Sequence, residues 1–201
     1  MNVLKILELA EKGHKGQFRK DNKTPYINHP IKVCEYLYKL GFTSKVYTDD
    51  ELSNTDYVYY AVALMHDLLE DTDVTEQEIV DVSNSRIYNL VEKLTFRKND
   101  DNPFAKTEYL LNIVDSFIEG DVAFVIKCID RICNVYDFIK EGNYKYAKIY
   151  FHKADMLWNE LYKRKNMYIN LWNEVIKINN LFSKDNNKGK HKYETASVYN
   201  S

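Results

Sequence analysis

The chain has 201 residues, of which 45% are hydrophobic and 29% are charged, a composition typical of a globular protein. Lysine and arginine total 28 and aspartate and glutamate total 30, which gives a net charge of −2. This balance provides no basic footprint for nucleic acid or an anionic membrane. No apolar stretch approaches the ~18 residues of a membrane-spanning helix. We therefore expect a cytoplasmic protein that binds neither nucleic acid nor membranes.

Glycine and proline are scarce, with 6 and 3 residues, which favours an all-α fold. The three cysteines, Cys34, Cys128 and Cys133, lie among apolar residues in no zinc-binding spacing. We interpret them as reduced thiols in the core, which indicates a reducing compartment. The chain is expected to form a helical bundle of roughly eight to ten helices over residues 1–182. A polar segment over residues 183–201 is expected to be a flexible tail.

Apolar periodicity and capping residues predict the helices in chain order. The first two run over 2–16 and 30–40, with a polar loop between them, and Asn54 or Thr55 is expected to cap the third, over 57–69. A capping box at Thr75 predicts a short helix, and further helices are expected over 84–95, 103–119, 121–140, 144–164 and 165–182. The segments 57–69 and 121–140 are apolar on nearly every side, so we expect both helices to be buried.

Four ionisable residues lie within six positions at the end of the first buried helix: His66, Asp67, Glu70 and Asp71. Burying unpaired charges costs several kcal/mol, and the three carboxylates also repel one another. A divalent cation would keep these carboxylates ionised. Residues three and four apart share a helix face, so one face can carry both metal ligands and an acid–base pair. The alternative interpretation is a solvated helix end.

The second buried helix contains Asp130 between apolar residues, with Lys127 and Asn134 on the same stripe. An interior aspartate needs a partner or a metal ion, so an ion pair with Lys127 or Arg131 is the alternative here. His29, just before Pro30, is biased toward extended backbone where a helix begins. Two imidazoles and two carboxylates without a thiolate suit a hard or borderline cation, with Mn²⁺ favoured over Mg²⁺, Fe²⁺ and Zn²⁺.

Together, these segments resemble the hydrolase domain of the RelA/SpoT family, and most closely its stand-alone members, the small alarmone hydrolases. The matching motifs are His14–Lys20, Thr24–Pro30, His66–Thr72 and Lys127–Asn134. The resemblance implies an all-α HD fold that binds one Mn²⁺ through His29, His66, Asp67 and Asp130.

The same resemblance implies roles for the remaining motif residues. Glu70 and Asp71 would orient or deprotonate the attacking water and handle the proton of the leaving group. Arg19 and Lys20 would line the nucleotide pocket, with Arg19 against the base, and Asn134 would contact the nucleoside. His14 matches a family position that is not a ligand, and it continues the apolar stripe of the first helix, so we expect it in the core or supporting the site.

Three departures from the family pattern concern substrate contacts. Tyr136 stands where family members often have arginine, and Asn22–Thr24 replaces an acidic residue followed by glycine. The connector over 45–56 is longer than usual. None of these departures removes a predicted metal ligand.

The expected reaction is hydrolysis of the 3′-pyrophosphate of ppGpp or pppGpp to GDP or GTP and pyrophosphate. Lys20 and Lys127 are candidates to stabilise the pyrophosphate, with Lys93, Lys98 and Lys106 as weaker ones. One alternative is an HD phosphohydrolase acting on another nucleotide, such as an adenosine alarmone, NADPH or a dNTP. Others are a non-catalytic nucleotide-binding module and a helical scaffold that uses the tyrosine-rich last helices, which also leave a homodimer open.

Overall fold

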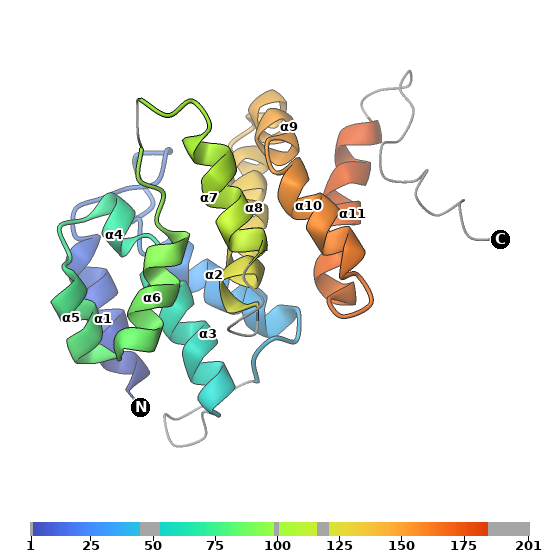
Figure 1. Ribbon diagram of the computed structural model, residues 1–201. Coiled ribbons are helices and arrows are strands. Elements are labelled where there is room, and N and C mark those ends of the chain that lie inside the picture. Colours follow the sequence, from blue (N-terminus) through green and yellow to red (C-terminus); the bar gives the residue numbers. More distant parts are fainter. Residues whose placement is uncertain (1, 45–52, 99–100, 116–120, 185–201) are drawn as a thin grey trace.

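The computed structural model describes residues 2–44, 53–98, 101–115 and 121–184. These residues form helices and no named strand, so the predicted all-α fold is confirmed (Figure 1). The helices are α1 (Val3–Gly13), α2 (Asn28–Lys39), α3 (Asn54–Met65), α4 (Leu68–Asp71), α5 (Glu76–Val82), α6 (Ser85–Leu94), α7 (Ala105–Val114), α8 (Val122–Lys140), α9 (Tyr144–His152), α10 (Asp155–Lys163) and α11 (Ile169–Lys184).

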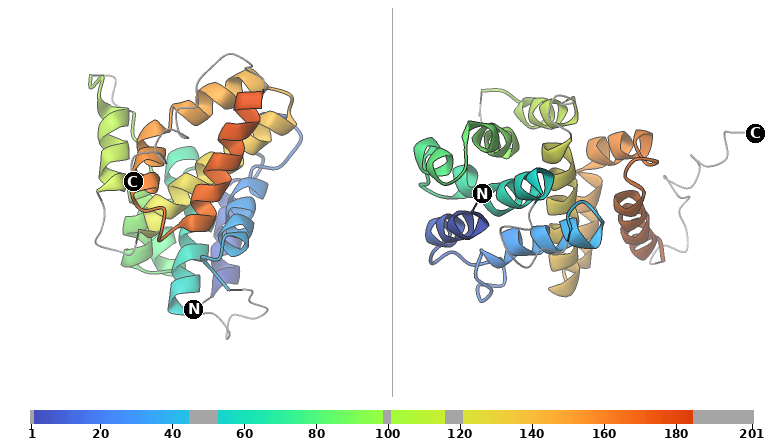
Figure 2. Two further views of the ribbon diagram at one scale, coloured as in Figure 1. Left: turned by 90° about the vertical axis from the view of Figure 1, so that its right-hand side faces the viewer. Right: turned by 90° about the horizontal axis from the view of Figure 1, so that it is seen from below.

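Helix α8 is the central element of the bundle. It packs against α2, α3 and α6, and also against α7, α9, α10 and α11 (Figure 2). Every residue from Val122 to Cys133 is buried, as a helix that is apolar all round requires. Full burial of a side chain such as Phe124 contributes about 1.5–3 kcal/mol. The predicted burial of both apolar helices, now α3 and α8, is confirmed.

Several helices begin at side chains that accept a hydrogen bond from a free backbone N–H. The predicted capping box of α5 is confirmed, because Thr75 and Glu78 each accept from the other's backbone. Helix α3 is capped by Ser53 and not by Asn54 or Thr55, which both lie inside the helix. Ser53 has extended backbone dihedral angles, so its Oγ reaches the N–H of Asp56 at 3.0 Å.

The predicted continuous helix over 57–69 is wrong at its end. Helix α3 stops at Met65, and His66 and Asp67 form a turn before α4. Nδ1 of His66 pairs with the carbonyl oxygen of Ala63 at 2.8 Å. In an unbroken helix that carbonyl would accept from the N–H of Asp67, so the imidazole competes with the helix at the point where it ends.

The predicted helix over 144–164 is also divided. Helix α9 ends at His152 and α10 begins at Asp155, with the fully buried Ala154 between them. The carbonyl of Phe151 accepts instead from Nε1 of the buried Trp158 at 2.9 Å. Helix α11 starts at Ile169, later than predicted, and continues through Ser183, the first residue of the predicted tail, to Lys184.

Parts of three predicted segments lie outside the described residues. These parts are 45–52 of the connector, 116–119 at the end of the helix predicted over 103–119, and 185–201 of the tail. The described part of that helix, α7, begins at Ala105 and ends at Val114. The division into a domain over 1–182 and a tail over 183–201 therefore stays a prediction.

The loop between α1 and α2 is held in a defined shape by its own hydrogen bonds. The N–H of Arg19 donates to the carbonyl of Thr24 at 2.8 Å, and Phe18 pairs with Pro25 as an isolated antiparallel bridge. The carboxylate of Asp21 accepts from the backbone N–H groups of Lys23 and Thr24. This loop fixes the positions of Arg19, Lys20 and Tyr26, which all face the site described below.

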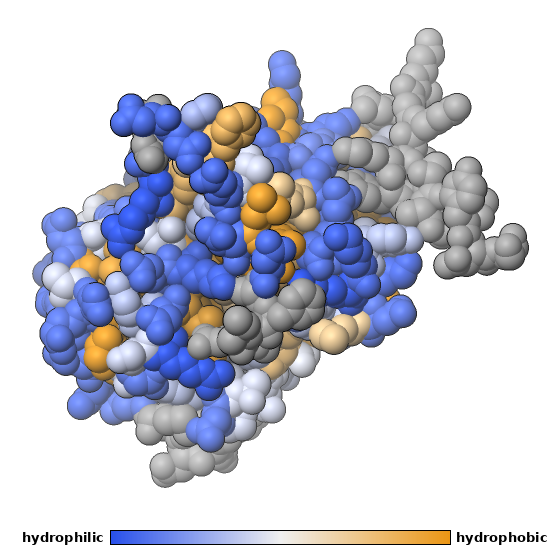
Figure 3. Space-filling view, in the orientation of Figure 1, coloured by the Kyte–Doolittle hydropathy of each residue, from blue (hydrophilic) through white to orange (hydrophobic). Residues whose placement is uncertain are grey.

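The outer face in Figure 3 is mainly hydrophilic, with scattered hydrophobic groups. No helix of the described residues combines the length and the apolar character that crossing a membrane requires. All three cysteines are free; Cys128 and Cys133 are buried and Cys34 is partly so, as their apolar surroundings predict.

Candidate active site

Four side-chain atoms from three separate parts of the chain converge beside the middle of α8. Nε2 of His29 lies 3.1 Å from Oδ1 of Asp130 and 3.7 Å from Oδ2 of Asp67. Nε2 of His66 lies 3.2 Å from Oδ2 of Asp67 and 4.0 Å from Oδ1 of Asp130. Donor atoms bound to a single ion at about 2.1 Å lie about 3–4 Å apart. The structure therefore brings His29, His66 and Asp67 together at spacings that fit one metal ion, with Asp130, the fourth predicted ligand, beside both imidazoles.

The local fold explains why these atoms face one another. His29 is in the first turn of α2, and His66 and Asp67 occupy the break between α3 and α4. The contact between Nδ1 of His66 and the carbonyl of Ala63 turns Nε2 toward the cluster. Asp130 projects from α8, which packs against both α2 and α3. The break in the predicted helix is thus what directs Asp67 toward His29.

The cluster is buried and electrically coupled. His29 is 2% exposed and His66 1% exposed, and Nε2 of His66 has no hydrogen-bond partner among the described residues. Burial lowers the pKa of His29, whereas Asp67 and Asp130 outweigh the same effect at His66 and raise its pKa to about 9. An unpartnered imidazole nitrogen beside two carboxylates is the environment that a divalent cation satisfies.

Both aspartates are held ionised despite their burial. Burial raises the pKa of each carboxyl group, but nearby cations outweigh it: chiefly His66 for Asp67, and Lys127 for Asp130. Lys127 lies 3.1 Å from Oδ2 of Asp130, so the alternative interpretation of an ion pair within α8 is also realised. That pair uses one oxygen of Asp130, while the other oxygen faces His29.

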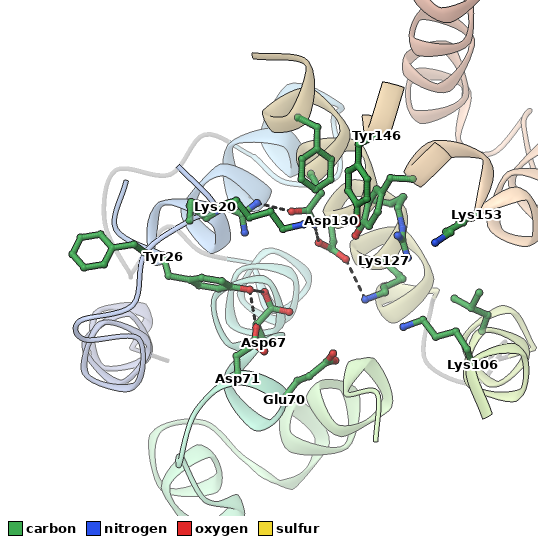
Figure 4. Close-up of a pocket in the computed structure, with 17 residues that line it drawn as sticks. Lys20, Tyr26, Asp67, Glu70, Asp71, Lys106, Lys127, Asp130, Tyr146 and Lys153 are labelled. Carbon is green, nitrogen blue, oxygen red and sulfur yellow. Dashed lines mark hydrogen bonds and ion pairs between the residues drawn. The ribbon is translucent and has the colours of Figure 1, made fainter. Parts of the chain in front are cut away.

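Glu70 and Asp71 lie on α4, one turn beyond Asp67. The backbone N–H of Phe96 donates to Oε2 of Glu70 at 2.9 Å, and burial raises the pKa of Glu70 above its ordinary value. The hydroxyl group of Tyr26 lies 2.8 Å from Oδ2 of Asp71 and 2.8 Å from Oδ2 of Asp67. The two predicted acid–base residues therefore lie beside the metal-binding cluster (Figure 4).

The predicted nucleotide contacts lie on the other side of Asp130. Nη2 of Arg19 donates to Oδ1 of Asn134 at 2.5 Å and to Oδ2 of Asp137 at 3.1 Å. Nδ2 of Asn134 in turn donates to Asp130. The ammonium group of Lys20 lies 4.3 Å from the ring centroid of Phe138. These contacts hold Arg19 and Lys20, which are expected to line the nucleotide pocket, against α8.

Comparison with known proteins identifies this arrangement. Residues 7–109, about half of the chain, match the family described as "HD domain". This chain belongs to the HD domain family. A protein named guanosine-3′,5′-bis(diphosphate) 3′-pyrophosphohydrolase MESH1, from Homo sapiens, is 33% identical over 137 residues, which cover 67% of this chain and 68% of that protein. A guanosine-3′,5′-bis(diphosphate) 3′-pyrophosphohydrolase from Borreliella burgdorferi is 35% identical over 94 residues, covering 47% of this chain and 12% of its own.

A solved structure has the same fold. It is described as a metazoan ortholog of SpoT that hydrolyzes ppGpp and plays a role in starvation responses. The two superpose with a TM-score of 0.68 at 23% sequence identity, over 88% of this chain and 92% of that one. Asp130 and Asn134 lie beyond the residues matched to the family, so their place in the site rests on the geometry given above.

A cavity of about 660 Å³ opens beside the cluster of the HD domain, a volume in the range of small-molecule sites. Eight of the predicted site residues line it: Arg19, Lys20, Asp67, Glu70, Asp71, Lys127, Asp130 and Asn134. His29 and His66 lie behind the wall, where the carboxylates cover them. Of the weaker lysine candidates, Lys106 lines the cavity, whereas Lys93 and Lys98 do not.

Several cavity residues were missed at the level of sequence: Tyr26, Arg131, Tyr150 and Lys153. A signal existed for Arg131, because an arginine in the middle of a buried helix is as anomalous as Asp130. The sequence suggests Arg131 only as a partner of Asp130, and the structure gives that position to Lys127. Tyr150 and Lys153 belong to the tyrosine-rich helices, where a repeated aromatic pattern conceals the few residues that turn inward.

Two further expectations concern His14 and Tyr136. His14 is 3% exposed and stacks on the ring of Tyr26 at 4.5 Å between centroids, so it supports the site from the core, as predicted. Tyr136 does not line the cavity, because its hydroxyl group donates to Glu174 at 2.8 Å. The expectation that this departure from the family lies near a substrate contact stays a prediction.

Proposed function

We propose that this HD domain hydrolyses the 3′-pyrophosphate of guanosine alarmones, ppGpp and pppGpp, and that it depends on one divalent metal ion, with Mn²⁺ favoured. The observation that carries the proposal is the convergence of two imidazoles and two carboxylates beside Glu70 and Asp71. The substrate is inferred from the names of the relatives, which are guanosine-3′,5′-bis(diphosphate) 3′-pyrophosphohydrolases.

His29, His66, Asp67 and Asp130 would hold the metal ion. When bound, such an ion lowers the pKa of a coordinated water molecule and polarises a phosphoryl oxygen. The chain itself contributes the fixed geometry, because Ala63 orients the imidazole of His66 and Lys127 neutralises one oxygen of Asp130. Burial lowers the pKa of Lys127, but the neighbouring carboxylate of Asp130 outweighs burial and raises it. Lys127 therefore stays charged beside the reacting phosphate.

In the reaction, the water oxygen bonds to the phosphorus attached to O3′ of the ribose, and the bond between phosphorus and O3′ breaks. Pyrophosphate leaves, the water loses one proton and O3′ gains one. Glu70 accepts the proton of the water, because its raised pKa brings the carboxylate closer to neutral pH as a base. Asp71, held by the hydroxyl group of Tyr26, orients the water, and the proton that Glu70 accepted reaches O3′.

The nucleoside occupies the side of the cavity lined by Arg19, Lys20 and Asn134. The planar guanidinium group of Arg19 is suited to stacking on a base, and its hydrogen bonds to Asn134 and Asp137 fix its plane. The N–H edge of the guanidinium group is thus held on α8, and stacking on the base would use one of its faces.

Purified protein incubated with ppGpp and Mn²⁺ tests the proposal. We expect release of pyrophosphate and GDP in equal amounts, and EDTA should stop the reaction until excess Mn²⁺ is restored. A parallel panel of an adenosine alarmone, NADPH and dNTPs tests the substrate by product identity. Faster turnover of any of these compounds than of ppGpp contradicts the guanosine assignment. If neither ppGpp nor any compound of the panel is turned over, the assignment as an enzyme is contradicted.

A further inference from the structure

Arg131 is a buried cation for which the described part of the chain supplies no anionic partner. Its residue exposure is 6%, its Nε has no hydrogen-bond partner, and none of the ion pairs among the described residues includes it. Its guanidinium group lies 4.0 Å from the ring centroid of Tyr150 and lines the cavity. Leaving a buried charge unpaired is costly, so an anion that enters the cavity would compensate this cost.

Three lysines share the space near Arg131. Figure 4 shows Lys106, Lys127 and Lys153 directed toward the same part of the cavity, across from Asp67 and Asp71. Only Lys127 among them is paired with a metal-binding carboxylate. Partial desolvation, and after it the charges of Lys127 and Arg131, lower the pKa of Lys106 to about 8.

Two of these cations, Lys106 and Lys153, come from parts of the chain that hold no member of the metal cluster, whereas Lys127 and Arg131 share α8 with Asp130. Lys106 is on α7 and Lys153 directly follows α9, whereas His29, His66 and Asp67 come from α2 and the turn after α3. Lys106 and Lys153 thus line a part of the cavity of about 660 Å³ that lies away from Asp67 and Asp71. A substrate with two separate phosphate groups matches this division, one group at each part.

We propose that Arg131, Lys106 and Lys153 form a second anion subsite, which binds the 5′-diphosphate that the reaction leaves intact. This inference rests on the proposed function and extends it. The HD domain would act efficiently only on nucleotides that carry phosphates at both the 3′ and 5′ positions, because the second group neutralises a cation cluster that is otherwise unpaired.

The decisive experiment compares two substrates in three variants. The substrates are ppGpp and guanosine 3′-diphosphate with a free 5′-hydroxyl group. The variants are Arg131→Gln, Lys153→Gln and the control Lys145→Gln, whose lysine is exposed on α9 outside the cavity lining. Arg131→Gln should lower kcat/KM for ppGpp about 10-fold or more. The exposed Lys153→Gln should lower it about 3-fold. Neither should change kcat/KM for the 5′-hydroxyl substrate more than about 2-fold.

Calorimetric binding of GDP to metal-free protein gives a readout that is independent of turnover. The affinity should fall in Arg131→Gln by the same factor as kcat/KM and stay unchanged in Lys145→Gln. Melting curves check folding, and because the substitution removes an unpaired buried charge, Tm should not fall. If Arg131→Gln nevertheless unfolds, the exposed Lys153→Gln carries the comparison.

The outcomes separate this inference from the proposed function. Equal losses on both substrates would place the reacting pyrophosphate on Arg131 and overturn the assignment to the 5′-diphosphate. GDP affinity that is the same in Arg131→Gln and wild type would overturn the subsite altogether. If the wild-type protein fails to hydrolyse ppGpp, and Arg131→Gln binds GDP more weakly than the wild type does, the subsite stands and the proposed reaction falls.

Discussion

The hydroxyl group of Tyr26 lies 2.8 Å from Oδ2 of Asp67, so a residue of the α1–α2 loop holds a carboxylate of the metal-binding cluster. The same hydroxyl group reaches Asp71 at 2.8 Å, and the ring stacks on the buried His14. Burial and the two carboxylates raise the pKa of Tyr26, so the phenol keeps its proton and remains a donor. Tyr26 is thus a positioning residue that links a proposed metal ligand to a proposed acid–base residue.

Replacing Tyr26 with phenylalanine should weaken metal binding about 10-fold or more, since residues that orient ligands contribute that much. We expect kcat to fall and KM for the nucleotide to change less than about 2-fold, because the ring and its packing remain. Calorimetric titration with Mn²⁺ and steady-state kinetics measure the two effects. A changed KM with unaltered kcat and metal affinity would show that Tyr26 acts on the nucleotide instead.

Asp67→Ala and Asp130→Ala should each abolish turnover and tight metal binding. Each substitution removes one of the four donors and leaves each buried imidazole with one neighbouring carboxylate instead of two. Asp81→Ala, at an exposed position on α5, is the matched control and should behave as wild type. Turnover near the wild-type rate in either ligand variant is incompatible with the assigned cluster.

Glu70→Gln should lower kcat by about 10²–10⁴-fold, the range for loss of a general base. Because burial raises the pKa of Glu70, the carboxylate is lost as pH falls through a value above the ordinary 4.5. The acidic limb of the kcat/KM profile should therefore lie above pH 4.5 in the wild type and disappear in Glu70→Gln. An unchanged acidic limb in the variant would assign that titration to another group.

Binding of GDP should weaken as pH rises through about 8, where Lys106 loses its proton. Desolvation, Lys127 and Arg131 lower the pKa of Lys106, while Glu70 and Asp130 raise it, and the lowering effects dominate. Lys106→Arg should remove the decline, because arginine stays charged. The free energy of unfolding changes with pH in the opposite direction. Between pH 8 and 10.5 this lysine keeps its proton in the unfolded chain but loses it in the folded protein, so it makes stability rise with pH.

Arg164→Ala should destabilise the fold by about 3–5 kcal/mol, as expected for breaking a buried ion pair. Its guanidinium group donates to Asp121 at 2.8 Å and to the carbonyl of Val114 at 2.9 Å, which joins the end of α10 to α8 and α7. Urea unfolding measures the change, with Lys163→Ala as the exposed control. A loss below about 1 kcal/mol would mean that Asp121 is satisfied by Tyr168 alone.

The sequence was most informative where a charged residue lies within an otherwise apolar helix. Asp130 within a buried helix and the charges after Met65 identify the cluster because a buried charge needs a partner. The all-α class and the burial of α3 and α8 follow from apolar periodicity alone. The roles of the individual residues came from the family resemblance, and they stay predictions until the variants above are measured.

The sequence did not reveal features that depend on distant contacts. The turn at His66 and the break at Ala154 contain neither glycine nor proline, so no local rule predicts them. In both places a side chain, His66 or Trp158, hydrogen-bonds a carbonyl that the helix would otherwise use. The inward direction of Tyr150 and Lys153 likewise depends on how α9 packs on α8, which periodicity does not specify.

The break between α9 and α10 has an evolutionary consequence. Lys153 lies in that break and Tyr150 one turn before it, while most of the metal-binding cluster belongs to the N-terminal half of the chain. With the proposed anion subsite, changes in α9 would alter which phosphorylated compounds are accepted without disturbing the groups proposed to cleave them. Among HD domain proteins, divergence of ligand preference should accordingly concentrate in this helix, while the hydrolytic apparatus remains constant.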